Sequence, residues 1–303
     1  PIGATLANMV IGVATPVVAY VVVDGKTVMS GSRMTIIAGV FSICAILCYI
    51  VCFKLTRERV EVPASSQKVS ASAIFKSIFT NRALLGIIVA AIFVLLSQLT
   101  VMSLAGYVYP NVYGSAAAQS TASLLGTVVM LIVCAPFASK LAAKFGKKEL
   151  AVASSICSAL VWLVCLIWRP ASVWGFVACY ILANVGMGFF NTIIWAMITD
   201  VIDDAEVRSG IREDGTIYSV YSFARKLGQA FSSGLVGALL GIIGYTEATA
   251  FDPAVTRGIF NMACIAPIIG FVCIVLALVF LYPLNKKKVE ENVAALAARR
   301  NSK

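Results

Sequence analysis

Histidine is absent from this 303-residue chain, and charged residues make up only 13% of it. The chain therefore lacks the side chain that proteins use most often as a general base and as a metal ligand. Its nine cysteines lie within or beside apolar runs, where we interpret them as small buried side chains. We therefore expect no metal centre, no cofactor and no enzymatic activity.

Aspartate and glutamate are also missing from the long apolar runs that fill most of the sequence. The chain is 60% hydrophobic, and its mean hydropathy of +0.93 lies far outside the range of soluble domains. A helix needs about 20 apolar residues to cross a bilayer core of about 30 Å, and runs of that length recur here. The sequence predicts an all-α, multi-pass membrane protein.

Eight apolar segments predict eight membrane helices, near 1–23, 34–53, 83–108, 115–139, 150–168, 172–199, 216–243 and 258–283. The chain accordingly divides into a two-helix part at 1–53, a linker at 54–82, a six-helix part at 83–283 and a basic tail at 284–303. Apolar residues at helical spacing predict a short amphipathic helix near 74–79, lying on the inner leaflet.

Most of the 24 lysine and arginine residues fall in loops on one face of this arrangement. Basic loops stay on the cytoplasmic side of a membrane, and anionic lipid lies beneath them. We therefore expect the cytoplasmic (inner) membrane as the location, with a cytoplasmic C-terminus. These loops explain the net charge of +10, so no nucleic-acid partner is expected.

The stretch 200–230 interrupts the apolar pattern and holds six of the 14 acidic residues. These carboxylates stand at a helix end and in a cytoplasmic loop, where they do not suit a proton relay across the membrane. They could form a gate that pairs with basic residues of another helix bundle in one conformation and releases them in the other. The alternative is an ordinary solvated loop. The candidate gate residues are Asp200, Asp203, Asp204, Glu206, Arg208 and Arg212.

The segment after this stretch carries a polar stripe with a lysine at its centre. A helix places its members on one face, at steps of three and four residues. Because lipid does not solvate a lysine, such a stripe is expected to face a water-filled cavity or the bundle interior. The alternative is that Lys226 and Arg225 extend toward the cytoplasm, and Arg225, off the stripe, favours it. The stripe consists of Ser219, Ser222, Lys226, Gln229 and Ser233.

The preceding segment carries Asn184, Asn191 and Trp195 on one helix face. An indole plate and amide groups suit a sugar, because they match its ring face and its hydroxyls. Trp195 could equally belong to an interfacial aromatic belt. Gln98 and Thr100 are weaker candidates of the same kind.

The charged stretch and the helix after it resemble the C-terminal signature of the glycoside–pentoside–hexuronide:cation symporters, a branch of the major facilitator superfamily. The run KLAAKFGKKE between the fourth and fifth segments resembles that superfamily's loop motif, without its usual acidic residue. Asp204 also departs from the family pattern, where tyrosine is frequent. The matching elements are Asp200-x-x-Asp203-x-x-Glu206, Gly210-x-Arg212-x-Asp214-Gly215, Tyr218-Ser219, Phe223 and Lys226-x-Gly228.

The resemblance implies a twelve-helix fold in two halves, of which this chain would hold helices five to twelve as a fragment. It implies a monomeric sugar:cation symporter that works by alternating access, with Na⁺ or H⁺ as the coupling ion and its ligands mostly on the missing helices. Lys226 would lie near the sugar and cation sites, and Ser222 one turn before it. The candidate sugar-binding residues are Lys226, Ser222, Asn191, Trp195 and Gln229.

Two other functions remain in competition with symport. One is a non-transporting membrane scaffold or sensor derived from a transporter. The other is a membrane-embedded enzyme, which the absence of histidine and of metal-type spacing makes the least supported of the three.

Overall fold

The computed structural model describes residues 20–23, 26–29, 31–56, 81–212, 214–246 and 248–301. The chain forms two compact units, Pro1–Lys68 and Val69–Lys303. The predicted linker falls largely on residues 57–80, so its amphipathic helix at 74–79 lies outside the described residues.

In the first unit, the described residues form a β-hairpin followed by one long helix. Strand β1 (Tyr20–Val23) pairs antiparallel with β2 (Lys26–Met29), and Tyr20 lies opposite Met29. The end of the segment predicted as the first membrane helix is therefore a strand, because three valines precede an Asp-Gly pair that favours a hairpin turn. Helix α2 (Gly31–Leu55) confirms the segment predicted at 34–53 and is apolar enough to cross a membrane.

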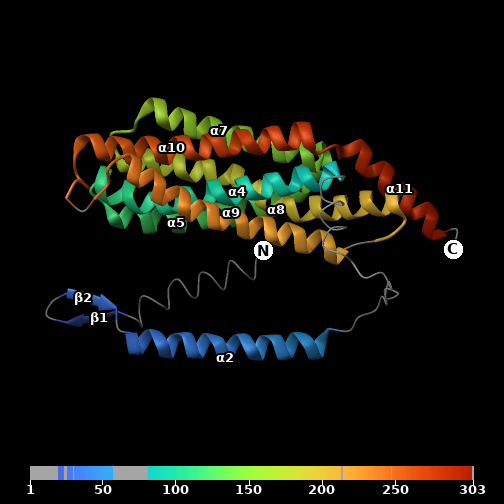
Figure 1. The fold of residues 1–303 in the computed structure, drawn as a ribbon, viewed down its shortest axis with the longest axis horizontal. Helices are drawn as coiled ribbons and strands as arrows, with labels where there is room; N and C mark the ends of the chain where they lie inside the picture. The colour runs from blue at the N-terminus through green and yellow to red at the C-terminus, as the bar shows by residue number, and fades with distance from the viewer. Residues whose placement is uncertain are drawn as a thin grey trace. The chain divides into compact units, whose positions relative to one another are not determined.

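The second unit is a bundle of long helices that run side by side (Figure 1). Three short π-helical turns, η1, η2 and η3, extend or join its α-helices. Its elements in chain order are α4 (Arg82–Tyr107), η1 (Val108–Val112), α5 (Ala116–Val129), η2 (Met130–Cys134), α6 (Ala135–Phe145), α7 (Lys147–Trp168), α8 (Val173–Ser209), α9 (Asp214–Ile242), α10 (Pro253–Leu276), η3 (Ala277–Leu281) and α11 (Lys286–Asn301).

Among the described residues, five helices are long and apolar enough to span a membrane: α2, α4 with η1, α7, α8, and α10 with η3. A sixth span results if the segment Ala118–Cys134 and the segment Pro136–Phe145, bent by 48°, count as one. Pro136 explains the bend, since proline removes a helical hydrogen bond. Helix α9 is not among the five, because its charged and hydroxyl side chains lower its hydropathy.

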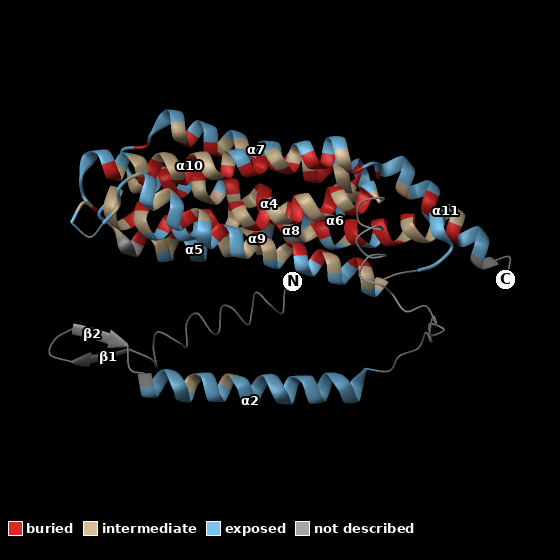
Figure 2. Cartoon of the chain, in the orientation of Figure 1, coloured by how far each residue is buried: buried red, intermediate tan, exposed pale blue. Residues whose placement is uncertain are grey.

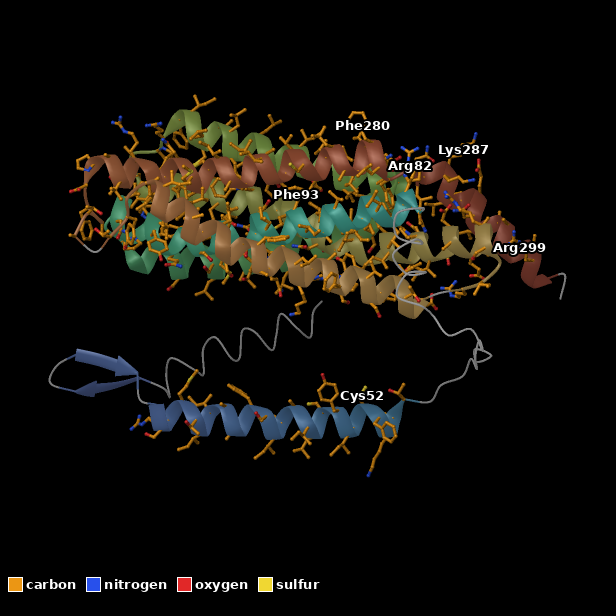
Figure 3. All side chains as sticks on the ribbon, in the orientation of Figure 1. Cys52, Arg82, Phe93, Phe280, Lys287 and Arg299 are labelled. Carbon is orange, nitrogen blue, oxygen red and sulfur yellow. The ribbon has the colours of Figure 1, made fainter. Side chains whose placement is uncertain are left out.

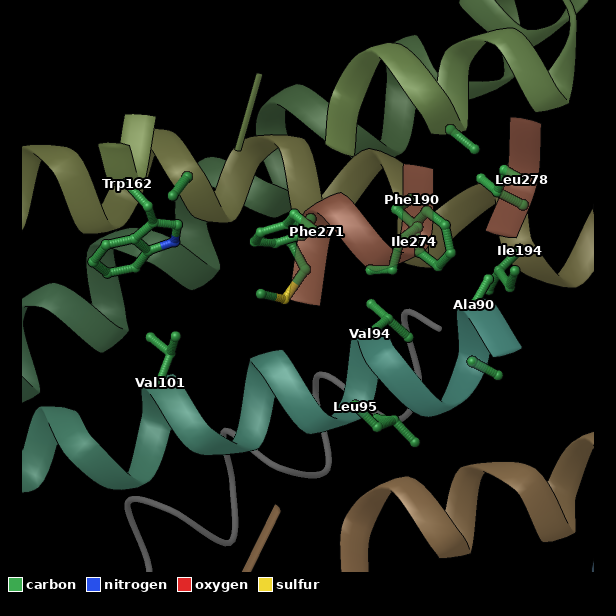
Figure 4. Close-up of a cluster of buried hydrophobic side chains, with 14 of the residues drawn as sticks. Ala90, Val94, Leu95, Val101, Trp162, Phe190, Ile194, Phe271, Ile274 and Leu278 are labelled. Atoms are coloured by element: carbon green, nitrogen blue, oxygen red, sulfur yellow. The ribbon is translucent and has the colours of Figure 1, made fainter. Parts of the chain in front are cut away.

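Helix α4 lies at the centre of the bundle and packs against both α9 and α10, while α7 packs against α8 and α10. Buried side chains gather between these helices and exposed ones cover the outside (Figure 2). In Figure 4, Val94 and Leu95 of α4 lie with Phe190 of α8 and with Phe271 and Ile274 of α10. This core holds α4, α8 and α9 in fixed positions, and those helices carry the candidate site.

Gly228 sets the distance between α9 and α4. A Cβ atom at this position would lie 2.7 Å from the carbonyl oxygen of Ile92 and 3.1 Å from its Cα. These are backbone atoms that no rotamer change can move. Gly234, two turns further along α9, has nothing within 4 Å of the same position.

We expect Gly228→Ala to lower the stability of the protein by about 1–3 kcal/mol, because the added methyl group pushes α9 away from α4. The measurement is thermal unfolding in detergent. Gly234→Ala is the matched control and is expected to leave the melting temperature unchanged or raise it, since alanine favours a helix. Equal melting temperatures for the two variants would contradict the close approach.

Candidate functional site

Charged side chains gather at one end of the second unit, which we call the basic end. Arg82, Lys287 and Arg299 mark it in Figure 3. The start of α4, the turn between α6 and α7, the last part of α8, the start of α9 and all of α11 lie there. Arg82 donates from Nη2 to the carbonyl oxygen of Phe280 at 3.0 Å, so α4 is tied to η3 at this end.

The innermost ion pair at the basic end joins α7 to α8. Nζ of Lys147 lies 2.6 Å from Oδ1 of Asp200, and only 5% of the Asp200 side chain is exposed. Lys148 donates to the carbonyl oxygen of Tyr282 at 2.6 Å. The turn that presents both lysines begins at Gly146, whose φ of 106° favours glycine. The KFGKKE run is therefore a tight turn between α6 and α7, and it presents Lys147 to Asp200 and Lys148 to the Tyr282 carbonyl.

Asp204 lies one turn further along α8, and its side chain is only 1% exposed. Its Oδ2 pairs with Nη2 of Arg208 at 2.9 Å. Its Oδ1 accepts a hydrogen bond of 3.1 Å from Nδ2 of Asn292, which is buried on α11. Arg299 of α11 also donates to the carbonyl oxygens of Glu206 and Val207 near the end of α8. The predicted basic tail is therefore a helix that docks on α8.

Arg212 gathers the remaining carboxylates of the stretch. Nη1 lies 2.9 Å from Oδ1 of Asp203 and 2.8 Å from Oε2 of Glu206, and Nε lies 3.0 Å from Oδ2 of Asp214. Burial alone would lower the pKa of Arg212, but hydrogen bonds to Glu206, Asp203 and Asp214 raise that pKa above the usual arginine value. The start of α9 is thereby tied to the end of α8.

All six candidate gate residues thus take part in ion pairs, and each of these pairs lies within the second unit. Helix α8 continues to Ser209, so the predicted helix end at 199 is too early and the acids occupy helix, not loop. Asp200 and Asp204 are four residues apart and lie on one buried face of α8. Hydropathy alone does not distinguish such buried acids from acids in a solvated loop. The role as a gate stays a prediction.

The predicted polar stripe lies along α9 on the side away from α4. Ser219, Ser222, Lys226 and Ser233 are exposed, and Gln229 is partly buried. Nζ of Lys226 donates to Oε1 of Gln229 at 3.1 Å. The opposite face of α9 is buried; its residues are Ile217, Tyr221, Ala224, Gly228, Ser232 and Val236.

Arg225 joins α9 to α8 through aromatic rings. Its guanidinium carbon lies 5.2 Å from the ring centroid of Trp195 and 5.8 Å from that of Tyr221. The two rings meet edge to face with centroids 5.4 Å apart. The sequence pattern favours an Arg225 side chain that extends toward the cytoplasm, because the sequence alone does not reveal a contact with Trp195, thirty residues earlier.

A second link joins α8 to α4. Nδ2 of Asn191 donates to Oε1 of Gln98 at 3.5 Å. Gln98, a weaker candidate for sugar binding, therefore lies beside Asn191, a stronger one. Asn184 instead donates to the carbonyl oxygen of Tyr180 on its own helix. Within the described residues, the hydrogen bonds and ring contacts do not join Lys226 or Ser222 to Asn191 or Trp195. The candidate residues therefore form three small groups on neighbouring helices.

The arrangement offers hydrogen-bond donors, amides and aromatic faces, which bind organic ligands. In the described part of the chain, no group of three or more His, Cys, Asp or Glu side chains is placed to hold a metal ion. The carboxylates of Asp203, Glu206 and Asp214 all pair with Arg212.

Comparison with known proteins gives a family and several relatives. The family model described as MFS/sugar transport protein matches residues 3–286. A glucuronide carrier protein homolog of Escherichia coli is 27% identical over 86% of this chain and 56% of its own length. A putative sulfoquinovose importer of Salmonella typhimurium is 27% identical over 88% of this chain and 56% of its own length. An isoprimeverose transporter of Lactiplantibacillus pentosus is 23% identical over 97% of this chain and 62% of its own length. The chain thus spans less than two thirds of the length of each.

Proposed function

Because the chain belongs to the MFS/sugar transport protein family, we propose that it moves a sugar across the cytoplasmic membrane as part of a sugar:cation symporter. It is a multi-pass membrane transporter and not an enzyme. The relatives named above are named for glucuronide, sulfoquinovose and isoprimeverose, which supports a sugar as the substrate. Na⁺ or H⁺ is the proposed coupling ion.

The observation that carries the proposal is the exposed polar face of α9. Lys226 and the hydroxyls around it lie on the outside of the unit, in the middle part of a long helix. At 1.5 Å per residue, Lys226 is roughly 18 Å from the Asp214 end of α9. Lipid cannot solvate such a face, so it lines a water-filled cavity in the assembled transporter. Lys226, Ser222, Gln229, Asn191 and Trp195 contact the sugar there.

In this account the basic end lies in the cytoplasm, because lysine and arginine concentrate there. The C-terminus is then cytoplasmic as well. The ion-paired residues Asp200, Asp203, Asp204, Glu206, Arg208 and Arg212 form the cytoplasmic gate. As a gate, these residues exchange their pairs within this unit for pairs with the other half of the protein when the two halves rock against each other.

Thiol labelling at Ser222 tests whether this face is the sugar site. Ser222→Cys is introduced into the complete gene product, including whatever its gene encodes ahead of Pro1, with the native cysteines replaced by serine. We expect rapid reaction with a membrane-impermeant maleimide, because a thiolate forms readily in water. A transported sugar is expected to slow the reaction.

Val164→Cys on α7 is the matched control. The Val164 side chain is 56% exposed on an apolar surface, so its cysteine faces lipid, stays protonated and reacts slowly. If Ser222→Cys reacts as slowly as Val164→Cys, the polar face of α9 does not line an aqueous site and the proposal fails.

A further inference from the structure

A cavity of about 270 Å³ lies at the end of the second unit that is away from the basic end and from α11 (Figure 1). It forms where η1, the turn between α7 and α8, and the first part of α10 meet. Its apolar walls include Val112, Pro170 and Phe260, and two arginines, Arg169 and Arg257, line it as well. The cavity therefore combines apolar surface with positive charge.

The positive charge of this cavity is unusual for its place in the fold. Lysine and arginine concentrate at the basic end, and the described loops at the opposite end hold no basic residue other than Arg169. Arg257, on the second turn of α10, comes from a distant part of the chain to the same cavity. Within the described residues, no acidic side chain lines the cavity and the salt bridges involve neither arginine. Both charges are thus left for a ligand.

Arg169 is held in place by its backbone and by one hydrogen bond. It ends α7 with a φ of 47° and is the one residue other than glycine that has a positive φ in the described part of the chain. This conformation is costly for a residue with a Cβ atom. Nη2 of Arg169 donates to Oδ1 of Asn261 on α10 at 3.0 Å. That contact uses one N–H donor of the guanidinium and leaves the others for an anion.

Two tryptophans indicate the depth of the cavity in the membrane. Trp168 is the last residue of α7 and Trp174 lies in the first turn of α8, so they enclose Arg169 in the sequence. Their side chains are 61% and 57% exposed. Exposed tryptophans of a membrane protein gather at the level of the lipid headgroups. Arg169 therefore lies where phosphate groups of the surrounding lipid are within reach.

We propose that this cavity binds the phosphate group of an anionic phospholipid, with Arg169 and Arg257 as its contacts. The planar guanidinium group matches two phosphate oxygens. Pro253, the first residue of α10, also lines the cavity, so the positive end of that helix lies beside the phosphate. Val112 and Phe260 offer apolar surface to the glycerol backbone and the upper acyl chains. The site is separate from the polar face of α9 and does not depend on which molecule is transported.

Protection of a thiol in the cavity tests this proposal. Thr256, a partly buried residue that lines the cavity, is replaced by cysteine in the complete gene product, with the native cysteines replaced by serine. The rate of reaction with a water-soluble maleimide is measured in detergent micelles as phosphatidylglycerol or phosphatidylcholine is added. We expect phosphatidylglycerol to slow the reaction at an about tenfold lower mole fraction, because choline cancels the charge of the phosphate. Equal protection by the two lipids would overturn the proposal.

Ala254→Cys is the matched control, since Ala254 is exposed in the first turn of α10 and does not line the cavity. Its reaction should be insensitive to phosphatidylglycerol. If it is slowed as much as that of Thr256→Cys, the lipid merely coats this end of the protein and the proposal fails.

Charge variants separate binding from a structural role. Arg169→Gln combined with Arg257→Gln should abolish the preference for phosphatidylglycerol, whereas Arg257→Lys, which keeps the charge, should retain most of it. If the double variant does not fold, Arg257→Gln alone, an exposed change on a helix surface, should reduce the preference. A preference that survives in every folded variant without these charges would contradict the proposal.

Glycerol 3-phosphate distinguishes a membrane lipid from a free phosphate ester. It carries the phosphate group without the acyl chains that the apolar walls contact, so it should not protect Thr256→Cys at the concentrations at which phosphatidylglycerol does. Equal protection by glycerol 3-phosphate would overturn the lipid as the ligand and assign the cavity to a water-soluble phosphate.

Discussion

Replacing Lys226 by alanine is expected to lower the initial rate of sugar uptake by about 100-fold, the effect of losing a charge-assisted hydrogen bond to the sugar. Lys226 is exposed on the polar face of α9, and its Nζ is held by Gln229 at 3.1 Å. This contact uses one of its three donors and leaves the others for a ligand. The measurement is uptake of labelled sugar by vesicles that contain the complete gene product.

Lys226→Ala is expected to affect acidic and neutral sugars alike, because the donors of the ammonium group also serve hydroxyl groups. Lys287→Ala provides the matched control, since Lys287 is exposed on α11 at the basic end. It should retain uptake within about twofold. Uptake by Lys226→Ala at the wild-type rate would remove Lys226 from the site.

Replacing Asp200 by alanine is expected to lower the free energy of unfolding by about 2–3 kcal/mol, because it leaves the Lys147 ammonium without its carboxylate. Lys147 is 32% exposed and Asp200 5% exposed, so water compensates only part of this loss. The pair joins the start of α7 to the middle of the charged stretch on α8. Denaturant unfolding in detergent micelles measures the change.

The double variant Asp200→Ala with Lys147→Ala tests the origin of that loss. Removing both charges should recover at least about 1 kcal/mol relative to the sum of the single variants. The exposed pair of Lys288 and Glu291 is the control, and Lys288→Ala should change stability by less than about 0.5 kcal/mol. Strict additivity of the Asp200 and Lys147 effects would contradict a coupled pair.

The sequence predicts the membrane helices well where an apolar run has polar ends. The segment expected at 34–53 is α2 (Gly31–Leu55), and the one expected at 150–168 is α7 (Lys147–Trp168). Both begin and end next to charged or polar residues, so hydropathy locates them closely. The number of eight spans is not confirmed, because the described residues hold five or six apolar spans, α9 is too polar to count among them, and most of the segment at 1–23 lies outside the described residues.

Hydropathy fails where charges are paired in space. Helix α8 continues past the predicted end, where Asp200 and Asp204 are ion-paired with Lys147 and Arg208 and a buried amide on α11 donates a hydrogen bond to Asp204. The tail forms a helix that packs on α8, with Asn292 and Leu296 buried. Arg208 is only four residues from Asp204, but Lys147 and Asn292 are distant from α8 in the sequence, so composition describes these segments as loop and tail.

In the candidate site too, the sequence predicts features within one helix but not contacts between helices. The polar stripe with Lys226 and Gln229 follows from the helical period within one segment, and the structure places both on the outer face of α9. The contact of Arg225 with Trp195 and the bond between Gln98 and Asn191 join different helices. Pairings of that kind come only from the packing of α4, α8 and α9.

Sugar accumulation is the measurement that tests the central claim most directly. The complete gene product is reconstituted in vesicles, and labelled acidic and neutral sugars are offered under an inward gradient of Na⁺ or of H⁺. The account predicts that at least one sugar accumulates above its external concentration and that an ionophore abolishes the accumulation. If the folded protein accumulates none of them under either gradient, the account is contradicted, and a non-transporting scaffold or sensor becomes the better description.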